Sequence, residues 1–222
     1  MALVVAIENG FAGVGAGAWL AGRGQPAAYS GVLSRRRRKG LFVRDRSHLE
    51  LVETTGYARF ASSESPFLTH IPCAAPVSAV SAKVLVAPAA AHSGSFVLRP
   101  VPMSARSALC VSQFAQPAED TPGGTPAEGA WVVAATAGRT ARIALAEGET
   151  VAVRPESLVA WTGNRPTGFC RKITFLDILL PRAPRELMLT FYGPAVVWIE
   201  GAPGVRRAGL SRRERARRAY GV

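Results

Sequence analysis

Short apolar segments separated by turn residues run through the second half of this chain, and their spacing constrains the fold more than any other feature. Segment 131–134 precedes a turn at Gly138, and segment 141–145 precedes a second turn. Turn signals about every 8 to 12 residues are typical of β-sandwiches, barrels and β-helices. Further apolar segments follow at 151–153, 173–180, 187–192 and 195–200.

Helical periodicity is weak throughout, and the composition also favours strands. The 222 residues are 48% hydrophobic, which is enough for one sizeable domain or two small ones with a real core. Val, Gly, Pro and Ala are abundant, a balance that favours strands and turns over long helices. In the first half, strand-like segments occur at 41–43, 48–53, 83–87, 95–101 and 107–112. The sequence therefore predicts a mostly β body over residues 41–202, less than roughly a quarter of it helical.

A weak internal similarity supports repeated sheet units. Residues 95–103 align with residues 150–158, and each segment is an apolar strand that ends in Arg-Pro before a turn and a second strand. Self-similarity of this kind is typical of folds that repeat one structural unit.

The net charge of +12 divides unevenly along the chain. Residues 1–46 carry +6, residues 47–202 are neutral, and residues 203–222 carry another +6. We therefore expect a basic extension or presequence at 1–40, a β-rich body at 41–202 with a linker at about 116–129, and a basic tail at 203–222. The first 40 residues are rich in Arg and poor in acidic residues, as organelle transit peptides are.

The basic residues predict an anionic partner, because arginine binds phosphate in a bidentate manner. RNA, or a ribonucleoprotein, and an anionic lipid surface such as cardiolipin both fit. Segment 210–220 has too few bulky apolar residues for a membrane-surface helix, which favours RNA. The alternative is that both ends are solvated and only aid solubility. The predicted nucleic-acid-binding residues are Arg35, Arg36, Arg37, Arg38, Lys39, Arg206, Arg207, Arg212, Arg213, Arg215, Arg217 and Arg218.

Residues able to carry catalysis or hold a metal or cofactor are sparse. The three histidines, His48, His70 and His92, show no metal-ligand spacing, and the three cysteines have no C-x-x-C pair. Residues 13–18 formally match a dinucleotide fingerprint, but the strand and helix that it needs are not indicated, so we interpret them as part of a Gly/Ala-rich leader. No apolar run is long enough to span a bilayer. We expect a protein that is not an enzyme and has no cofactor, metal or transmembrane segment.

Two stretches carry a resemblance to a known family. They are Gly129 to Trp161, which includes a Gly-Glu turn and a loop ending Leu158-Val159-Ala160, and Glu186 to Ile199, which includes Phe191-Tyr192-Gly193-Pro194. Together they resemble the altered-inheritance-of-mitochondria protein 24 family, which has a TRAP-like domain. The resemblance covers residues 125–202, and Ala195 stands where the family usually has Gly.

The resemblance implies a shortened double-stranded β-helix or β-sandwich without established catalytic residues. It also implies a mitochondrial location, in the matrix or associated with the inner membrane. We therefore expect a non-catalytic structural or interaction protein that docks onto an anionic assembly, such as a mitochondrial ribosome, beside other protein subunits. The alternatives are an inner-membrane organising scaffold that binds anionic lipid and a soluble domain that binds a small ligand.

Overall fold

The computed structural model describes residues 6–22, 26–37, 49–62, 65, 67–98, 109–116, 130–170 and 187–201. These residues form nineteen β-strands and two short 3-10 helices, η1 (Ser81–Lys83) and η2 (Ala89–Ala91). All strand pairs are antiparallel. The predicted all-β class is thereby confirmed.

Eighteen of the strands fall into three repeats of six, and β1 (Ala6–Glu8) adds to the first repeat. The first repeat consists of β2 (Phe11–Val14), β3 (Gly17–Ala21), β4 (Ala28–Tyr29), β5 (Leu33–Arg37), β6 (Glu50–Thr54) and β7 (Ala58–Ala61). The second consists of β8 (Phe67–Pro72), β9 (Val77–Val80), β10 (Val84–Pro88), β11 (His92–Leu98), β12 (Leu109–Phe114) and β13 (Trp131–Thr136). The third consists of β14 (Thr140–Leu145), β15 (Thr150–Val153), β16 (Leu158–Thr162), β17 (Thr167–Cys170), β18 (Leu187–Tyr192) and β19 (Ala195–Glu200).

Strand pairing follows the same plan in each repeat. The sixth strand lies between the first and the third, and the fifth lies between the second and the fourth. The second strand of one repeat then pairs with the third strand of the next, as β3–β10 and β9–β16 do. The result is four sheets: A (β1-β2-β7-β4), B (β5-β6-β3-β10-β13-β8), C (β11-β12-β9-β16-β19-β14) and D (β15-β18-β17).

The register also repeats. The ladder between β10 and β13 shifts between Val84 and Val86, and the ladder between β16 and β19 shifts between Leu158 and Ala160. A β-bulge at the same place in two repeats indicates that the backbone, and not only the strand order, is repeated.

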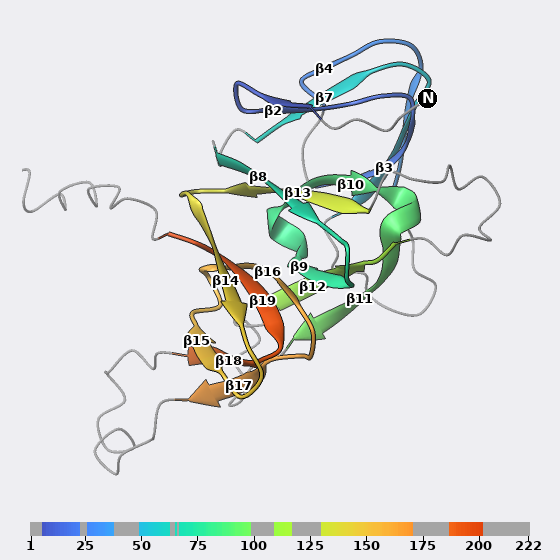
Figure 1. Cartoon of the computed structure of the whole chain (residues 1–222). Helices are drawn as coiled ribbons and strands as arrows, with labels where there is room; N and C mark the ends of the chain where they lie inside the picture. Colours follow the sequence, from blue (N-terminus) through green and yellow to red (C-terminus); the bar gives the residue numbers. More distant parts are fainter. Residues whose placement is uncertain are drawn as a thin grey trace, which may run out of the picture.

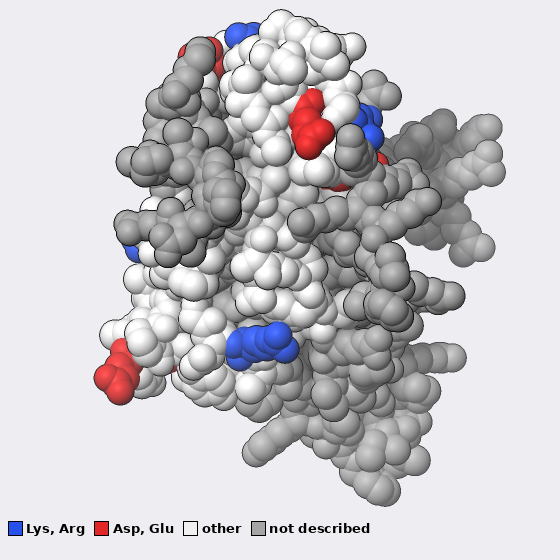
Figure 2. All heavy atoms as spheres, turned by 90° about the vertical axis from the view of Figure 1, so that its right-hand side faces the viewer, with Lys and Arg blue, Asp and Glu red and all other residues white. Residues whose placement is uncertain are grey.

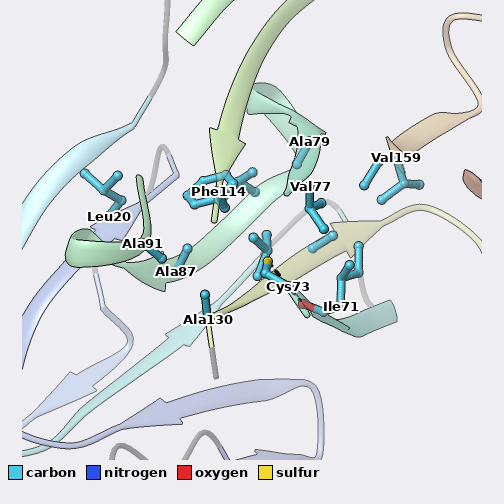
Figure 3. Close-up of a cluster of buried hydrophobic side chains, with 14 of the residues drawn as sticks. Leu20, Ile71, Cys73, Val77, Ala79, Ala87, Ala91, Phe114, Ala130 and Val159 are labelled. Atoms are coloured by element: carbon cyan, nitrogen blue, oxygen red, sulfur yellow. Dashed lines mark hydrogen bonds between the residues drawn. The ribbon is translucent and has the colours of Figure 1, made fainter. Parts of the chain in front are cut away.

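The four sheets stack as layers, with sheets A and D at opposite ends (Figure 1). Trp19, Val86 and Phe60 belong to the core between sheets A and B, and Trp161, Phe191 and Leu158 to the core between sheets C and D. The middle core joins sheets B and C, and Figure 3 shows part of it, with Ile71 and Val77 beside the buried Cys73. Face-to-face packing of twisted sheets is the sandwich arrangement that the sequence predicts.

The first 40 residues were predicted as an extension, or as a leader around the Gly13–Ala18 motif, and this is wrong. Residues 6–22 and 26–37 form β1 to β5 and are paired within sheets A and B. The side chains of Val14, Trp19 and Leu20 are fully buried. The last three residues of β2 and of β3 are all buried, and burying the apolar ones among them stabilises the body.

Other predictions have mixed outcomes. The predicted strands at 48–53, 83–87 and 107–112 correspond, within two residues, to β6, β10 and β12. The similarity of 95–103 to 150–158 relates β11 to β15, which hold different places in the repeat, so it does not identify the repeat that the fold has. The strands predicted at 41–43 and 173–180, most of the linker at 116–129 and the tail at 203–222 lie outside the described residues.

Candidate functional site

Three of the predicted phosphate-binding arginines lie on an edge strand of the body. Arg35, Arg36 and Arg37 are in β5, which pairs with β6 and, among the described strands, forms one edge of sheet B. The basic cluster therefore begins on rigid backbone and not in a tail. Such an edge presents backbone N–H and C=O groups as well as side chains, so it combines hydrogen-bonding capacity with positive charge.

Acidic residues of the neighbouring strand offset part of this charge. Arg35 forms an ion pair with Glu50 of β6, and Ser34 Oγ donates a hydrogen bond to Glu53 Oε2 at 3.0 Å. The Arg35 side chain is 30% exposed and that of Glu50 is 19% exposed. An exposed pair of this kind contributes little to stability, on the order of 0 to 1 kcal/mol. The ion pair with Glu50 therefore holds the Arg35 side chain against β6.

Most of the net charge lies beyond the described residues. The described residues carry nine basic and seven acidic side chains, and the remaining segments carry eighteen and eight. Figure 2 shows one face of the stack, where isolated blue and red groups stand on a mainly uncharged surface. Arg38, Lys39 and the seven arginines from Arg206 to Arg218 fall outside the described residues. The structure thus brings together only Arg35, Arg36 and Arg37.

A buried ion pair lies between the sheets rather than at a surface site. Lys83 Nζ, in η1, is 2.7 Å from Glu200 Oε1 of β19 and donates a hydrogen bond to the Glu156 carbonyl oxygen at 2.5 Å. The backbone N–H of Ala137 donates to Glu200 Oε2 at 2.9 Å. Burial lowers the pKa of Lys83, and the hydrogen bond to Glu200 only partly offsets this effect. The pair joins η1 and β19 to the segments that hold Glu156 and Ala137, and every contact is internal, so its role is structural.

The histidines and cysteines do not assemble a metal or nucleophile site within the described part of the chain. His70 packs against Trp131, with ring centroids 6.0 Å apart, and burial lowers its pKa. Burial raises the pKa of the Cys73 thiol to about 12, so this thiol is not ionised near neutral pH. No cluster of three His, Cys, Asp or Glu side chains suited to a metal occurs among the residues described. His48 and the side chain of Cys170 are not among them.

One polar network was missed from the sequence because its members are distant along the chain. His92 Nε2 lies 3.1 Å from Ser95 Oγ, Ser95 Oγ lies 3.4 Å from Ser112 Oγ, and Ser112 Oγ lies 2.8 Å from Ser81 Oγ. A Ser–His contact is one component of a nucleophilic site. Ser112 and Ser81 are fully buried, however, and tie β12 to η1. The network thus holds the β11–β12 hairpin, and no short motif in the sequence marks it.

The outer face of sheet A carries a second group that the sequence did not reveal. Arg59 Nε donates a hydrogen bond to Tyr57 Oη at 2.8 Å, and the Arg59 guanidinium carbon lies 5.5 Å from the Tyr57 ring centre. The Tyr57 ring covers Gly13 so closely that a Cβ there would lie 2.3 Å from Tyr57 Oη. The hydrogen bond to Tyr57 raises the pKa of Arg59. Tyrosine and arginine are both enriched at protein interfaces.

Comparison with known proteins identifies the fold and nothing further. The chain is similar to a crystal structure of the protein SPYM3_0169 from Streptococcus pyogenes, with a TM-score of 0.63 and 14% sequence identity over 99% of each chain. No family model matches the sequence, and no curated protein matches it significantly. At this identity, the stacked-sheet fold is what the two proteins share. Within the described residues, no helix is long and apolar enough to cross a bilayer.

Proposed function

We propose that this chain is a non-catalytic interaction protein that docks a rigid β body onto a phosphate-rich partner, with RNA in a ribonucleoprotein as that partner. The observation that carries the proposal is the position of Arg35, Arg36 and Arg37 on the edge strand β5. A basic cluster fixed to a sheet edge loses less conformational freedom on binding than one in a free tail. The basic residues that follow β5 and those at 206–218 extend the same charge.

RNA fits the cluster better than an anionic membrane does. Arginine is the predominant basic residue in both clusters, and its planar guanidinium matches phosphate oxygens in pairs. A membrane-surface helix needs bulky apolar residues opposite its charges, and segment 210–220 offers mainly alanines. Residues 125–202 resemble the altered-inheritance-of-mitochondria protein 24 family, and this supports placing the proposed complex in mitochondria, for example at the ribosome.

The test measures binding of the full chain to a fluorescein-labelled single-stranded RNA at several salt concentrations. Arg36→Gln combined with Arg37→Gln should flatten the plot of log K against log salt by about 0.7 per lost phosphate contact. These two residues are chosen because Arg35 is paired with Glu50. The matched control is Arg139→Gln combined with Arg142→Gln, which removes the same charge from the β14 region.

Three outcomes separate the possibilities. A slope that falls in the edge-strand variant and not in the control supports the proposal. Equal slopes in the two variants would show that binding depends on total charge alone, and would contradict a site at β5. Binding to cardiolipin-containing vesicles without binding to RNA would replace the proposed partner with a membrane.

A further inference from the structure

We propose that copies of this chain associate head to tail, with β15 of one copy pairing antiparallel to β4 of the next. The interaction surfaces are the two strand edges that the repeat leaves open at the ends of the stack. The proposal is independent of the partner proposed above, because it concerns neither β5 nor the basic segments.

The strand order identifies these two edges. In each repeat the second strand pairs with the third strand of the following repeat, which joins β3 to β10 and β9 to β16. The second strand of the last repeat is β15, and the third strand of the first repeat is β4. Among the described residues, β15 is an edge of sheet D and β4 is an edge of sheet A. Each therefore has, on one side, the open position that its counterparts fill with a strand.

Joining the two edges would produce a sheet of the same kind as sheets B and C. Sheet D contains the second, fifth and fourth strands of the last repeat, which are β15, β18 and β17. Sheet A contains the third, sixth and first strands of the first repeat, which are β4, β7 and β2, with β1 added. Sheets B and C each combine three strands like those of sheet D, from one repeat, with three strands like those of sheet A, from the next repeat. A second copy of the chain is therefore the occupant whose backbone already matches both edges. An exposed edge strand can pair with a strand of another chain, and proteins use this pairing for recognition as well as having to avoid it as a route to aggregation.

The internal joints also fix the expected register. Leu20 lies opposite Ala87 in the β3–β10 joint, and Ser78 lies opposite Trp161 in the β9–β16 joint. Ala152 holds the same place in β15 as Leu20 in β3 and Ser78 in β9, and Tyr29 holds the same place in β4 as Ala87 and Trp161 in their strands. The same register therefore places Ala152 opposite Tyr29. Ala152 is exposed, as expected for a residue at an open edge.

Side-chain exposure supports this pairing. Tyr29 is 57% exposed, whereas Ala87 and Trp161, which hold the same place in the other repeats, are both 0% exposed. Val32, which follows β4, is also an exposed large apolar residue. At the other end, Tyr192 of β18 is exposed and lies opposite Thr150 of β15. Tyr29 on the open edge β4, with Val32 after it and Tyr192 on the strand beside β15, thus leaves apolar surface exposed near both open edges, as at surfaces that another chain covers.

The edge that β4 presents is held in place. The Ala27 N–H donates to the Arg59 carbonyl oxygen at 2.7 Å, and the Ser30 N–H donates to the Tyr57 carbonyl oxygen at 2.7 Å. These bonds attach both ends of the short strand to β7, so its other side remains oriented for a partner. Because the two edges differ, the contact is heterologous, and repetition generates a closed ring or an open filament.

The test measures self-association of the full chain, without RNA, by sedimentation velocity over a wide range of concentration. Tyr29→Lys and Ala152→Lys each place a charge at an exposed position of one edge, and each should weaken association about tenfold or more. Phe67→Lys is the control, because Phe67 is an exposed apolar residue on β8, an edge strand away from both open ends. Circular dichroism verifies that each variant keeps the β fold.

Disulfide trapping tests the register. Tyr29→Cys in one preparation and Ala152→Cys in another should form a covalent dimer when mixed and mildly oxidised, since directly opposed residues on paired strands fall within disulfide reach. Each variant alone should yield far less dimer. A chain that stays monomeric at every concentration, or association that the two edge lysines leave unchanged, overturns the proposal.

Discussion

Sheets B and C in the middle of the stack and sheets A and D at its ends share one pairing plan, yet they differ in the side chains that this plan presents. Arg59 faces Gly13 across β2 and β7 in sheet A. The corresponding pairs are Val133 with His70 in sheet B and Trp198 with Arg142 in sheet C. Val133 and Trp198 are buried beneath a neighbouring sheet, whereas Arg59 is exposed.

This difference shows that the backbone pairing repeats, whereas the type of side chain at an equivalent position depends on whether a neighbouring sheet covers it. Where a second sheet covers a position, burial of an apolar side chain lowers the free energy of folding. Where no described sheet of the same chain covers it, the position holds a charged residue that stays in contact with water. In a single chain, the exposed Tyr57–Arg59 pair forms a cap on the outer face of sheet A.

The largest expected effect comes from removing a side chain in the middle of the stack. Trp198→Ala should lower the free energy of unfolding by about 3 to 5 kcal/mol, because it leaves a large cavity in the core between sheets B and C. Arg59→Ala, at the corresponding position of the end sheet, should leave the free energy of unfolding unchanged within about 0.5 kcal/mol. Urea unfolding followed by tryptophan fluorescence and circular dichroism measures both, and equal losses would refute the equivalence of the two positions.

A second comparison contrasts the buried ion pair with the pair at the sheet edge. Glu200→Ala should cost about 3 kcal/mol, because it leaves Lys83 buried without its carboxylate. Glu50→Ala, which breaks the exposed pair with Arg35, should cost no more than about 1 kcal/mol. The double variant Lys83→Met, Glu200→Leu should recover most of the first loss. If the double variant is as unstable as Glu200→Ala, the cost arises from packing or from the unpaired Ala137 N–H, and not from the unpaired charge of Lys83.

The pH dependence of stability should separate two buried groups. Burial raises the pKa of Cys73 from 9.0 to about 12, so above pH 9 the unfolded chain loses this proton first and stability falls. Burial lowers the pKa of Lys83 below 10.5, so between the lowered value and 10.5 the folded chain loses its proton first and stability rises.

Variants at these two positions should therefore act in opposite directions. Cys73→Ala should make the alkaline loss of stability shallower than in the parent chain, and Lys83→Met should make it steeper. Urea midpoints between about pH 8 and 11 supply the measurement, since this range spans the reference pKa values of both groups. A single common slope for all three proteins would exclude both contributions.

The smallest expected effect concerns the cap on sheet A. Gly13→Ala should push the Tyr57 ring away, because the new Cβ would lie 2.3 Å from Tyr57 Oη and 3.0 Å from its Cζ. Tyr57 is exposed and free to swing outward, so stability should change by less than about 1 kcal/mol. The Arg59 side-chain resonances in NMR spectra should shift as the hydrogen bond to Tyr57 is lost. Unchanged resonances would show that the ring does not depend on the missing Cβ.

The sequence predicts the strand class well, because that information is local. Alternation and turn residues mark β13, β14 and β15 directly, and the predicted ends lie within a few residues of those observed. Leu158, Val159 and Ala160, which were expected to end a loop, instead begin β16. β1 to β5 were missed because the glycines of this stretch and the arginines of β5 suggested a leader. Trp19 and Leu20 are fully buried there, but two large apolar residues do not outweigh that composition in a sequence pattern. Tertiary packing outweighed local composition there.

The repeat itself and the polar networks could not be predicted. Equivalent positions hold Arg59, Val133 and Trp198, so side-chain identity conceals a relation that only strand pairing reveals. Ser81 and Ser112 meet across thirty-one residues, and Lys83 and Glu200 across 117. Contacts between residues so far apart in the sequence depend on the topology of the fold, and they cannot be predicted from local sequence patterns.

The position of β19 has a consequence for synthesis on the ribosome. β19 lies between β16 and β14 in sheet C, so this sheet stays incomplete until residue 200 has been made. At about 5 to 20 residues per second, translation reaches that point only after roughly 10 to 40 seconds. β14 is complete at residue 145, so it waits for β19 during the last 55 of these residues, or roughly 3 to 11 seconds. During that interval β14 and β16 lack the strand that joins them, and sheet C can close only once β19 has emerged.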